Sequence, residues 1–215
     1  MLDEPIAISG ATSFVIQETQ IFARFIQSLY QYTDENGDLK IFDQNYKRLK
    51  SGELMTIIDI LGYDVNSASV LQLIYKDLEM QISDEPEIKT KVEQLLCEVT
   101  SLIDKEILNF EIDLEMEDMA LIDLFKALRI RIEIQTDTVF ERALEIIQVF
   151  KYLAKKKLLI FVNIGAYLTM EELKSFEEYT ELHNIPVLLI DRYPFEGLKK
   201  QIILDEDFVI LASNL

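Results

Sequence analysis

The chain has 215 residues, 49% of them hydrophobic, and a formal net charge of −18. This length suits one large domain or a domain with a substantial insertion. One cysteine excludes an intrachain disulfide and fits a reducing cytosol, and nothing at the amino terminus resembles a secretion signal. No apolar run approaches the ~20 residues that span a bilayer, so we expect a cytoplasmic protein without a membrane partner. The acidic balance argues against nucleic acid unless the bases are concentrated locally.

The first third of the chain alternates between strand and helix patterns. Residues 21–32 place apolar side chains at helical spacing. A turn-rich loop, TDENGD, occupies residues 33–38. Short apolar segments predict three strands, at 13–16, 38–43 and 55–60.

The middle of the chain has no strand-like run between residues 67 and 128. One apolar stripe predicts a helix over 70–82, and a longer stripe predicts a helix over 86–109 that begins with an early proline, Pro86. If continuous, the second helix extends ~36 Å at ~1.5 Å per residue, which suits an arm rather than a compact domain. A third helix is expected over 119–128.

Strand and helix patterns then alternate again to the end of the chain. Residues 158–162, LLIFV, are apolar without interruption, which predicts a strand covered on both faces. Thr169 and Glu172 form a capping box before a helix, and Asp137 is expected to cap the helix over 139–154. The remaining predicted strands are 131–136, 186–191 and two short ones within 201–211. We therefore expect an α/β head made of residues 1–66 and 131–215, with a helical leg inserted at 67–130.

Such sheets bind ligands at the carboxyl ends of their strands, yet no phosphate-binding loop is present. The six glycines are scattered singly, and no Gly-Lys-Ser/Thr sequence occurs. His183, the only histidine, is expected at a helix end, and Cys97 is expected to fill a small space in the core. Charge-relay catalysis and zinc binding are therefore not expected.

Six motifs in one register resemble the CRISPR-associated Csn-two family, which acts in spacer acquisition in type II-A systems. They are LDEPI (2–6), LYQY (29–32), DILGYDVNSAS (59–69), QTDTVFE (135–141), KYLAKKKLLIFVN (151–163) and ILDEDF (203–208). The resemblance implies a head similar to P-loop ATPase domains and a helical leg. It also implies a homotetrameric ring without ATPase activity that binds double-stranded DNA ends in a central hole, holds Ca²⁺ and works with other CRISPR adaptation proteins.

Acidic side chains alternate with apolar ones after the long predicted helix. In an extended chain this alternation puts four carboxylates on one face, and a hard divalent cation relieves their mutual repulsion. A solvated acidic face is the alternative that the sequence itself favours, whereas the resemblance favours calcium. The candidate ligands are Glu111, Asp113, Glu115, Glu117, Asp118 and Asp123.

Basic residues cluster at three places, none with the interleaved aromatic residues of single-strand binders. Lys47, Arg48 and Lys50 form one cluster, for which, as for the others, solvated loop charge is the alternative. The other clusters are the candidates for contacting DNA phosphates: Lys126, Arg129, Arg131, Lys155, Lys156 and Lys157.

Three functions are compatible with these features. The first is a non-catalytic DNA-end-binding ring, which the resemblance favours. The second is a divalent-metal-dependent nuclease that uses the acidic cluster around 111–123, although no base lies in the segment from Glu106 to Glu117 to steady a scissile phosphate. The third is an α/β subunit that works only through protein contacts.

Overall fold

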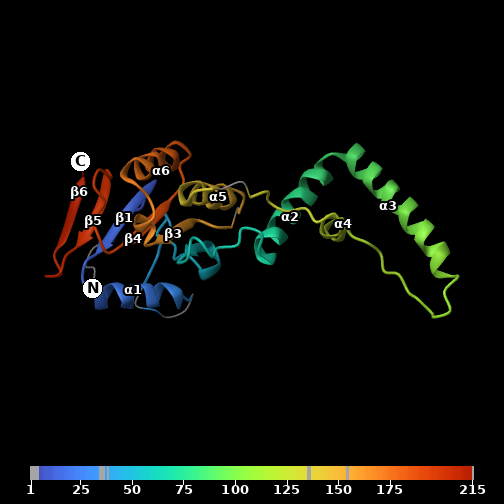
Figure 1. Cartoon of the computed structure of the whole chain (residues 1–215), viewed down its shortest axis with the longest axis horizontal. Coiled ribbons are helices and arrows are strands. Elements are labelled where there is room, and N and C mark those ends of the chain that lie inside the picture. The colour runs from blue at the N-terminus through green and yellow to red at the C-terminus, as the bar shows by residue number, and fades with distance from the viewer. Residues whose placement is uncertain (1–4, 34–36, 38, 135–136, 154, 215) are drawn as a thin grey trace. The chain divides into compact units, whose positions relative to one another are not determined.

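The structure is a computed structural model that describes residues 5–33, 37, 39–134, 137–153 and 155–214. The chain divides into two compact units, which are coloured along the sequence in Figure 1. Unit 1 comprises Met1–Tyr63 and Gln135–Leu215, and unit 2 comprises Asp64–Ile134. The boundaries expected from the sequence, at 67 and 130, lie just inside unit 2.

Unit 1 is built on a six-stranded sheet in the order β2-β3-β4-β1-β5-β6. Every neighbouring pair is parallel except β5–β6, which form an antiparallel pair around a turn at Asp205–Phe208. The predicted α/β fold is thus confirmed, and the structure shows that its sheet is mostly parallel. The strands are β1 (Ala11–Ile16), β2 (Leu54–Ile57), β3 (Leu158–Val162), β4 (Val187–Asp191), β5 (Lys200–Leu204) and β6 (Ile210–Asn214).

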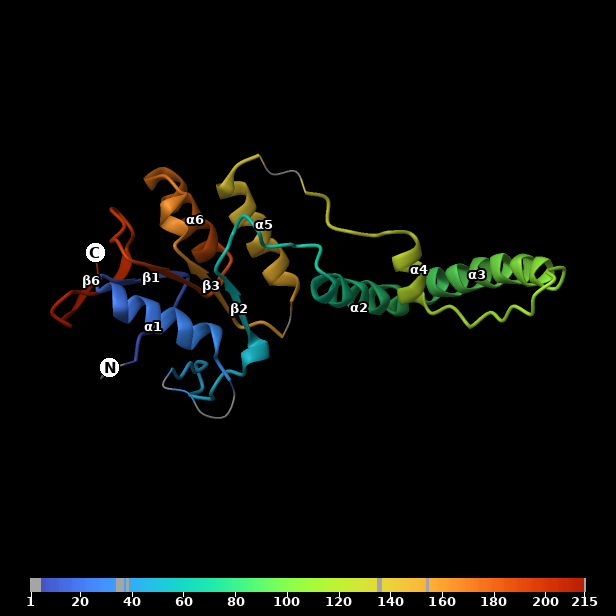
Figure 2. The ribbon, with the colours of Figure 1, turned by 60° about the horizontal axis from the view of Figure 1, so that its bottom comes forward.

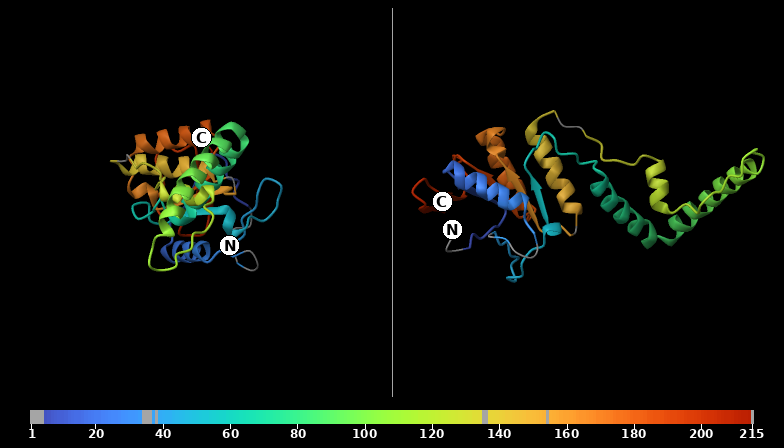
Figure 3. Two further views of the ribbon diagram at one scale, coloured as in Figure 1. Left: turned by 90° about the vertical axis from the view of Figure 1, so that its right-hand side faces the viewer. Right: turned by 90° about the horizontal axis from the view of Figure 1, so that it is seen from below.

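Helices cover both faces of this sheet, as Figure 3 shows from two sides. Helix α1 (Thr19–Tyr30) packs on one face, where Phe14 meets Phe25 with ring centroids 5.4 Å apart. Helices α5 (Val139–Tyr152) and α6 (Met170–Leu182) cover the other face, where Phe161 meets Phe176 at 5.8 Å. Every residue of β3 is buried, because both faces are covered.

Two strands expected from the sequence do not form. The predicted strand over 38–43 is wrong for its described residues, which contribute only one isolated bridge, between Phe42 and Arg48. Residues 131–134 of the strand predicted over 131–136 have no regular structure, and the last two residues lie outside the described part of the chain. Asp137 is also not the cap of α5, because Thr138 takes that position in a capping box with Glu141. The capping box predicted at Thr169 and Glu172 is confirmed.

Unit 2 consists of three helices and a long segment without regular structure. Helices α2 (Ala68–Asp84) and α3 (Pro86–Ile107) are consecutive, and α4 (Leu121–Ala127) lies beside α2 (Figure 2). The residues between α3 and α4 form bends and irregular chain. Cys97 is exposed on α3, so its predicted place in a core is wrong. Among the described residues, no helix is long and apolar enough to cross a membrane.

Candidate nucleic-acid and metal sites

The predicted cations of unit 2 lie on a segment that is tied to α2. Tyr75 is buried, contacts the ring of Phe125 in α4 at 6.0 Å, and donates a hydrogen bond from its hydroxyl to the carbonyl oxygen of Ile130 at 2.7 Å. Asn66 bonds both backbone groups of Ile132, at 2.8 and 3.0 Å. These contacts fix the backbone on either side of Arg131, whose side chain is exposed.

Two predicted residues of opposite sign pair with each other on α4. The Lys126 Nζ lies 2.9 Å from Asp123 Oδ1, and both side chains are more than half exposed, at 61% and 51%. This hydrogen bond is the main reason that the pKa of Asp123 is lowered. Arg129 follows the helix in the left-handed conformation, with φ of 55°, and donates its backbone N–H to Lys126 O at 3.0 Å. Arg129 and Arg131 therefore remain the freer cations of this segment.

The predicted calcium ligands do not form a site within one chain. Residues 111 to 118 are all exposed, and no hydrogen bond or ion pair found in the described residues involves the carboxylates at 111, 113, 115, 117 and 118. Across the described ranges, no three His, Cys, Asp or Glu side chains lie close enough to hold a metal ion. The described residues of a single chain thus do not form a preformed calcium site.

Apolar side chains of unit 2 are exposed along the same stretch of chain. Helix α3 has no buried residue over its whole length of 22 residues. The irregular segment after it exposes Phe110 at 65% and Ile112 at 72%. An amphipathic helix normally buries its apolar face, so a helix that leaves much of this face exposed is expected to bind a partner there. The exposed apolar residues of α3 are Ile88, Leu95, Val99, Leu102 and Ile103.

The lysine triplet predicted to bind DNA belongs to unit 1, before β3, and two of its members bond within the fold. Lys156 is partly buried, and its Nζ donates to Leu54 O at 2.6 Å; burial lowers its pKa. The Lys157 Nζ lies 2.7 Å from Glu53 Oε1, and this hydrogen bond raises the pKa of Lys157. Lys155 is exposed and takes part in no salt bridge of the described residues. Only Lys155 is therefore fully available to an external anion.

In nucleotide-binding α/β folds, phosphate binds at the amino terminus of the helix that follows the first strand. In this chain a carboxylate, that of Glu18, occupies the amino terminus of α1. Glu18 is the N-cap of α1 and accepts a hydrogen bond from Ile21 N at 2.7 Å. Bonds from the backbone N–H groups of Gln20 and Ile21 are the main reason that the pKa of Glu18 is lowered. An anionic ligand at this helix end would have to displace it, since both need the same N–H groups.

Asp191, which sequence reasoning did not single out, is the most perturbed acid of unit 1. It ends β4, is 6% exposed and accepts a hydrogen bond from Gly165 N–H, while its Oδ2 has no partner among the described residues. Burial raises its pKa to about 7 against the pull of that N–H. The only signal in the sequence is an acid directly after the apolar run VLLI.

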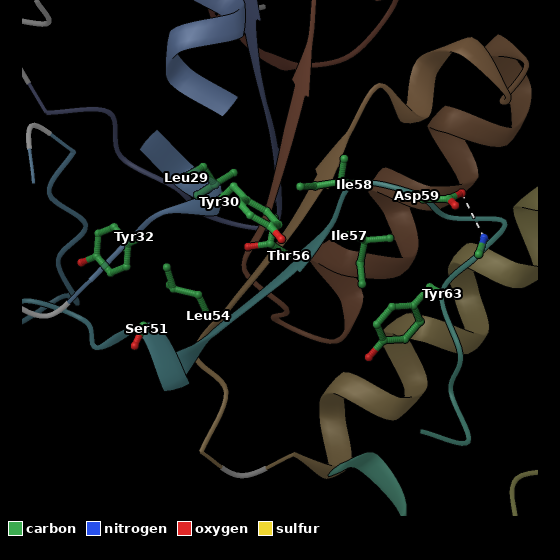
Figure 4. A pocket seen from close by; sticks show the side chains of 11 residues that line it. Leu29, Tyr30, Tyr32, Ser51, Leu54, Thr56, Ile57, Ile58, Asp59 and Tyr63 are labelled. Carbon is green, nitrogen blue, oxygen red and sulfur yellow. Dashed lines mark hydrogen bonds between the residues drawn. The ribbon is translucent and has the colours of Figure 1, made fainter. Parts of the chain in front are cut away.

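A pocket of about 500 Å³ opens beside β2, with apolar and tyrosine side chains around it (Figure 4). Its one acid, Asp59, is occupied by the loop, because Oδ1 accepts from Leu61 N at 3.1 Å and Gly62 N at 2.9 Å. The pocket offers no converging set of charged groups for catalysis.

The fold and these surfaces define a class of protein with an α/β unit and a helical unit but without a phosphate-binding loop in its sequence. The family model of the CRISPR-associated protein Csn2 matches residues 31–208. The chain belongs to the Csn2 family. A Csn2 protein of Enterococcus faecalis is 47% identical over 210 residues, which cover 98% of this chain and 95% of that protein. A Csn2 protein of Streptococcus agalactiae is 44% identical over 215 residues, covering 100% of this chain and 96% of that protein.

A solved structure supports the fold at low sequence identity. The crystal structure of Stu0660 of Streptococcus thermophilus matches with a TM-score of 0.60 and 13% identity, and the match covers 96% of this chain and 72% of that one. The family model and the two relatives, in turn, confirm the family predicted from the sequence motifs, and with it the association with CRISPR.

Proposed function

We propose that this chain is a non-catalytic, cytoplasmic DNA-binding protein of CRISPR spacer acquisition. In this proposal it assembles into a homotetrameric ring, encloses the ends of double-stranded DNA without sequence preference, and acts beside other CRISPR adaptation proteins. Membership of the Csn2 family supports the role in CRISPR. The observation that carries the assembly is the exposed apolar face of α3 in unit 2, a helix in which no residue is fully buried.

Self-association would bury the exposed apolar side chains of α3. The exposed apolar side chains of α3 recur at 88, 95, 99, 102 and 103, which places most of them on one helical face. Burying an apolar surface contributes ~25 cal/mol per Å², and a second copy of the same helix offers the same kind of surface. The exposed cations Arg129 and Arg131 of the same unit support phosphate contact.

Calcium belongs to this proposal as a ligand of the assembled protein rather than of one chain. The acids at 111 to 118 are exposed, and oxygen ligands of this kind suit a hard cation. Because no ligand cluster exists among the described residues of one chain, a second copy or a movement of the segment has to complete the coordination. No step of DNA binding is assigned to the metal.

Two features support the absence of nucleotide hydrolysis. The sequence has no Gly-Lys-Ser/Thr motif, and the carboxylate of Glu18 already occupies the amino end of α1. Magnesium-ATP is therefore expected neither to be hydrolysed nor to raise the melting temperature. A nuclease needs converging acids around a metal pair, and no observation on the described residues favours one.

Threading gives the sharpest test, because a closed ring admits DNA only at an end. A labelled linear duplex is displaced by unlabelled linear DNA or by covalently closed circles of the same length. We expect strong competition by linear DNA and weak competition by circles. Equal competition by both would rule out threading.

The role of calcium is tested by native mass and DNA affinity, each measured with calcium and with a chelator. We expect the chelator to lower the oligomer mass and the affinity together. The double variant Asp113→Asn/Glu115→Gln removes charge at nearly constant size and should reproduce the effect of the chelator. Unchanged mass, affinity and melting temperature would leave the acidic segment as a solvated face.

A further inference from the structure

A cationic surface of unit 1 lies at the amino ends of β2 and β3, and it includes a loop that the DNA-binding prediction left out. We define this amino-edge surface as residues 39–53, which lead into β2, and 155–157, which lead into β3. It holds seven of the 21 bases of the chain and two acids, a net charge of +5 in a chain of net charge −18. Its bases are Lys40, Lys47, Arg48, Lys50, Lys155, Lys156 and Lys157.

The two segments lie together in the fold. Lys157 N donates to Glu53 O at 2.7 Å, and the side chains of these residues form the 2.7 Å salt bridge. The Lys156 Nζ donates to Leu54 O, at the first residue of β2. Parallel pairing of β2 and β3, with Leu54 opposite Leu158, keeps the two lead-in segments at the same edge of the sheet. The surface is therefore a product of the topology.

The loop from Ile41 to Leu49 is held in one conformation by its own bonds. Leu49 N donates to Ile41 O and Asp43 N donates to Lys47 O, each at 2.8 Å. Leu49 is buried in the core, and its carbonyl accepts a 2.7 Å hydrogen bond from the Tyr32 hydroxyl. This anchoring presents the loop tip without the entropic cost of ordering it when a partner binds.

Both acids of the surface are used within it. Asp43 Oδ1 accepts from Asn45 N and Lys47 N, each at 2.9 Å. Glu53 is bonded by Lys157 and by Lys50 N at 2.7 Å. Apart from Lys157, the exposed lysines of the surface form no salt bridge within the described ranges: these are Lys40, Lys47, Lys50 and Lys155. The surface therefore combines lysines without salt-bridge partners with acids that already have partners.

The loop tip adds neutral hydrogen-bond donors to these cations. Gln44, Asn45 and Tyr46 are exposed and directly precede Lys47, and Tyr46 is 88% exposed. Amide, phenol and ammonium donors are the groups that contact phosphate and sugar oxygens in protein–DNA complexes. Lysine ammonium groups on a surface contact phosphates without reading the nucleotide sequence. The surface therefore suits a partner that is recognised by its charge and its backbone.

We propose that the amino-edge surface binds the phosphate backbone of duplex DNA, as a second contact in addition to the cations of unit 2. This inference rests on the proposed function, since it names the part of unit 1 that meets the same DNA. It predicts that Lys47 and Lys50, which were not among the residues expected to bind DNA, each contribute to the salt dependence of binding.

The test compares binding of a labelled linear duplex to the wild type and to Lys47→Gln/Lys50→Gln. Affinity is measured at ionic strengths of about 0.1 M and above, where the Debye length is ~10 Å or less. Each lost phosphate contact makes the negative slope of log Kobs against log salt shallower by ~0.9, so we expect the magnitude of the slope to decrease by about 1.8. Lys47→Arg/Lys50→Arg keeps the charge and should keep the wild-type slope.

A matched control removes the same charge at another place in unit 1. Lys174→Gln/Lys199→Gln should leave the slope at its wild-type value, and an equal decrease would mean that net charge alone acts, which overturns the inference. An unchanged slope for Lys47→Gln/Lys50→Gln in a protein that still binds duplex also overturns it, while the proposed function stands. If the wild type binds no duplex DNA, the proposed function itself is wrong. If the variant loses only single-stranded oligonucleotide binding, the partner named here is wrong.

Discussion

Replacing Asp191 by Asn should change how the stability of the protein depends on pH. Burial raises the pKa of Asp191 from 3.8 to about 7, so the folded protein holds a proton on this group that the unfolded chain releases. Between these values the free energy of unfolding falls as pH rises, because the native state binds more protons than the unfolded state. The full effect is about 4 kcal/mol, from ~1.36 kcal/mol for each unit of pKa.

The asparagine variant keeps an oxygen for the Gly165 N–H and cannot ionise. Its free energy of unfolding, minus that of the wild type, should therefore rise with pH by about 2.3 kcal/mol between pH 5 and pH 7 and level off near about pH 8. Urea unfolding at closely spaced pH values measures this difference. Asp207→Asn, at the exposed turn between β5 and β6, reports the contribution of net charge alone. Parallel pH profiles for Asp191→Asn and the wild type would refute the reasoning.

Three further changes test packing and assembly. Gly165→Ala should cost about 1–3 kcal/mol, because its Cβ would lie 1.9 Å from the Phe195 ring, and Phe195→Leu in the same chain should recover part of that loss in urea unfolding. Tyr75→Phe should lower the free energy of unfolding by about 1–3 kcal/mol, and the melting temperature with it, because the Ile130 carbonyl loses its 2.7 Å donor. An unchanged melting curve would show that water replaces the hydroxyl. Val99→Lys, on the exposed face of α3, should lower the native oligomer mass, whereas Leu182→Lys, 77% exposed on α6, should not.

The sequence predicted correctly those elements that depend only on residues close together in the chain. The strand over 158–162 was predicted because every residue is apolar, and the structure buries all five. The capping box of Thr169 and Glu172 depends on two side chains and the intervening turn, and it forms as predicted. The segment 38–43 is apolar at only three of its six positions, and its described residues fold back onto their own loop through the bridge from Phe42 to Arg48. Whether a short strand joins a sheet depends on a partner that the pattern does not contain.

The candidate sites were less accessible from the sequence, for the same reason. The stripe of α3 predicted a helix correctly, but periodicity does not say whether the apolar face has a partner within the chain, and so Cys97 was expected in a core. Asp191 became notable only when its burial and its N–H partner at Gly165 were known. The second basic cluster was visible in the sequence, but its proximity to the lysine triplet follows from the pairing of β2 with β3.

An unusual salt dependence follows from placing a small cationic surface on a strongly acidic chain. The amino-edge surface carries +5 and the remaining residues carry −23, since the whole chain carries −18. At ~0.01 M ionic strength the Debye length is ~30 Å, so a DNA phosphate at that surface also experiences the distant acids. At ~0.1 M it is ~10 Å, and mainly the nearby lysines act.

Duplex affinity should therefore rise as salt increases from ~0.01 M, reach a maximum, and fall above ~0.1 M as counterion release weakens. Titration of a labelled duplex across this range measures the curve. An affinity that falls steadily from the lowest salt would mean that the acids exert no effective repulsion where the DNA binds.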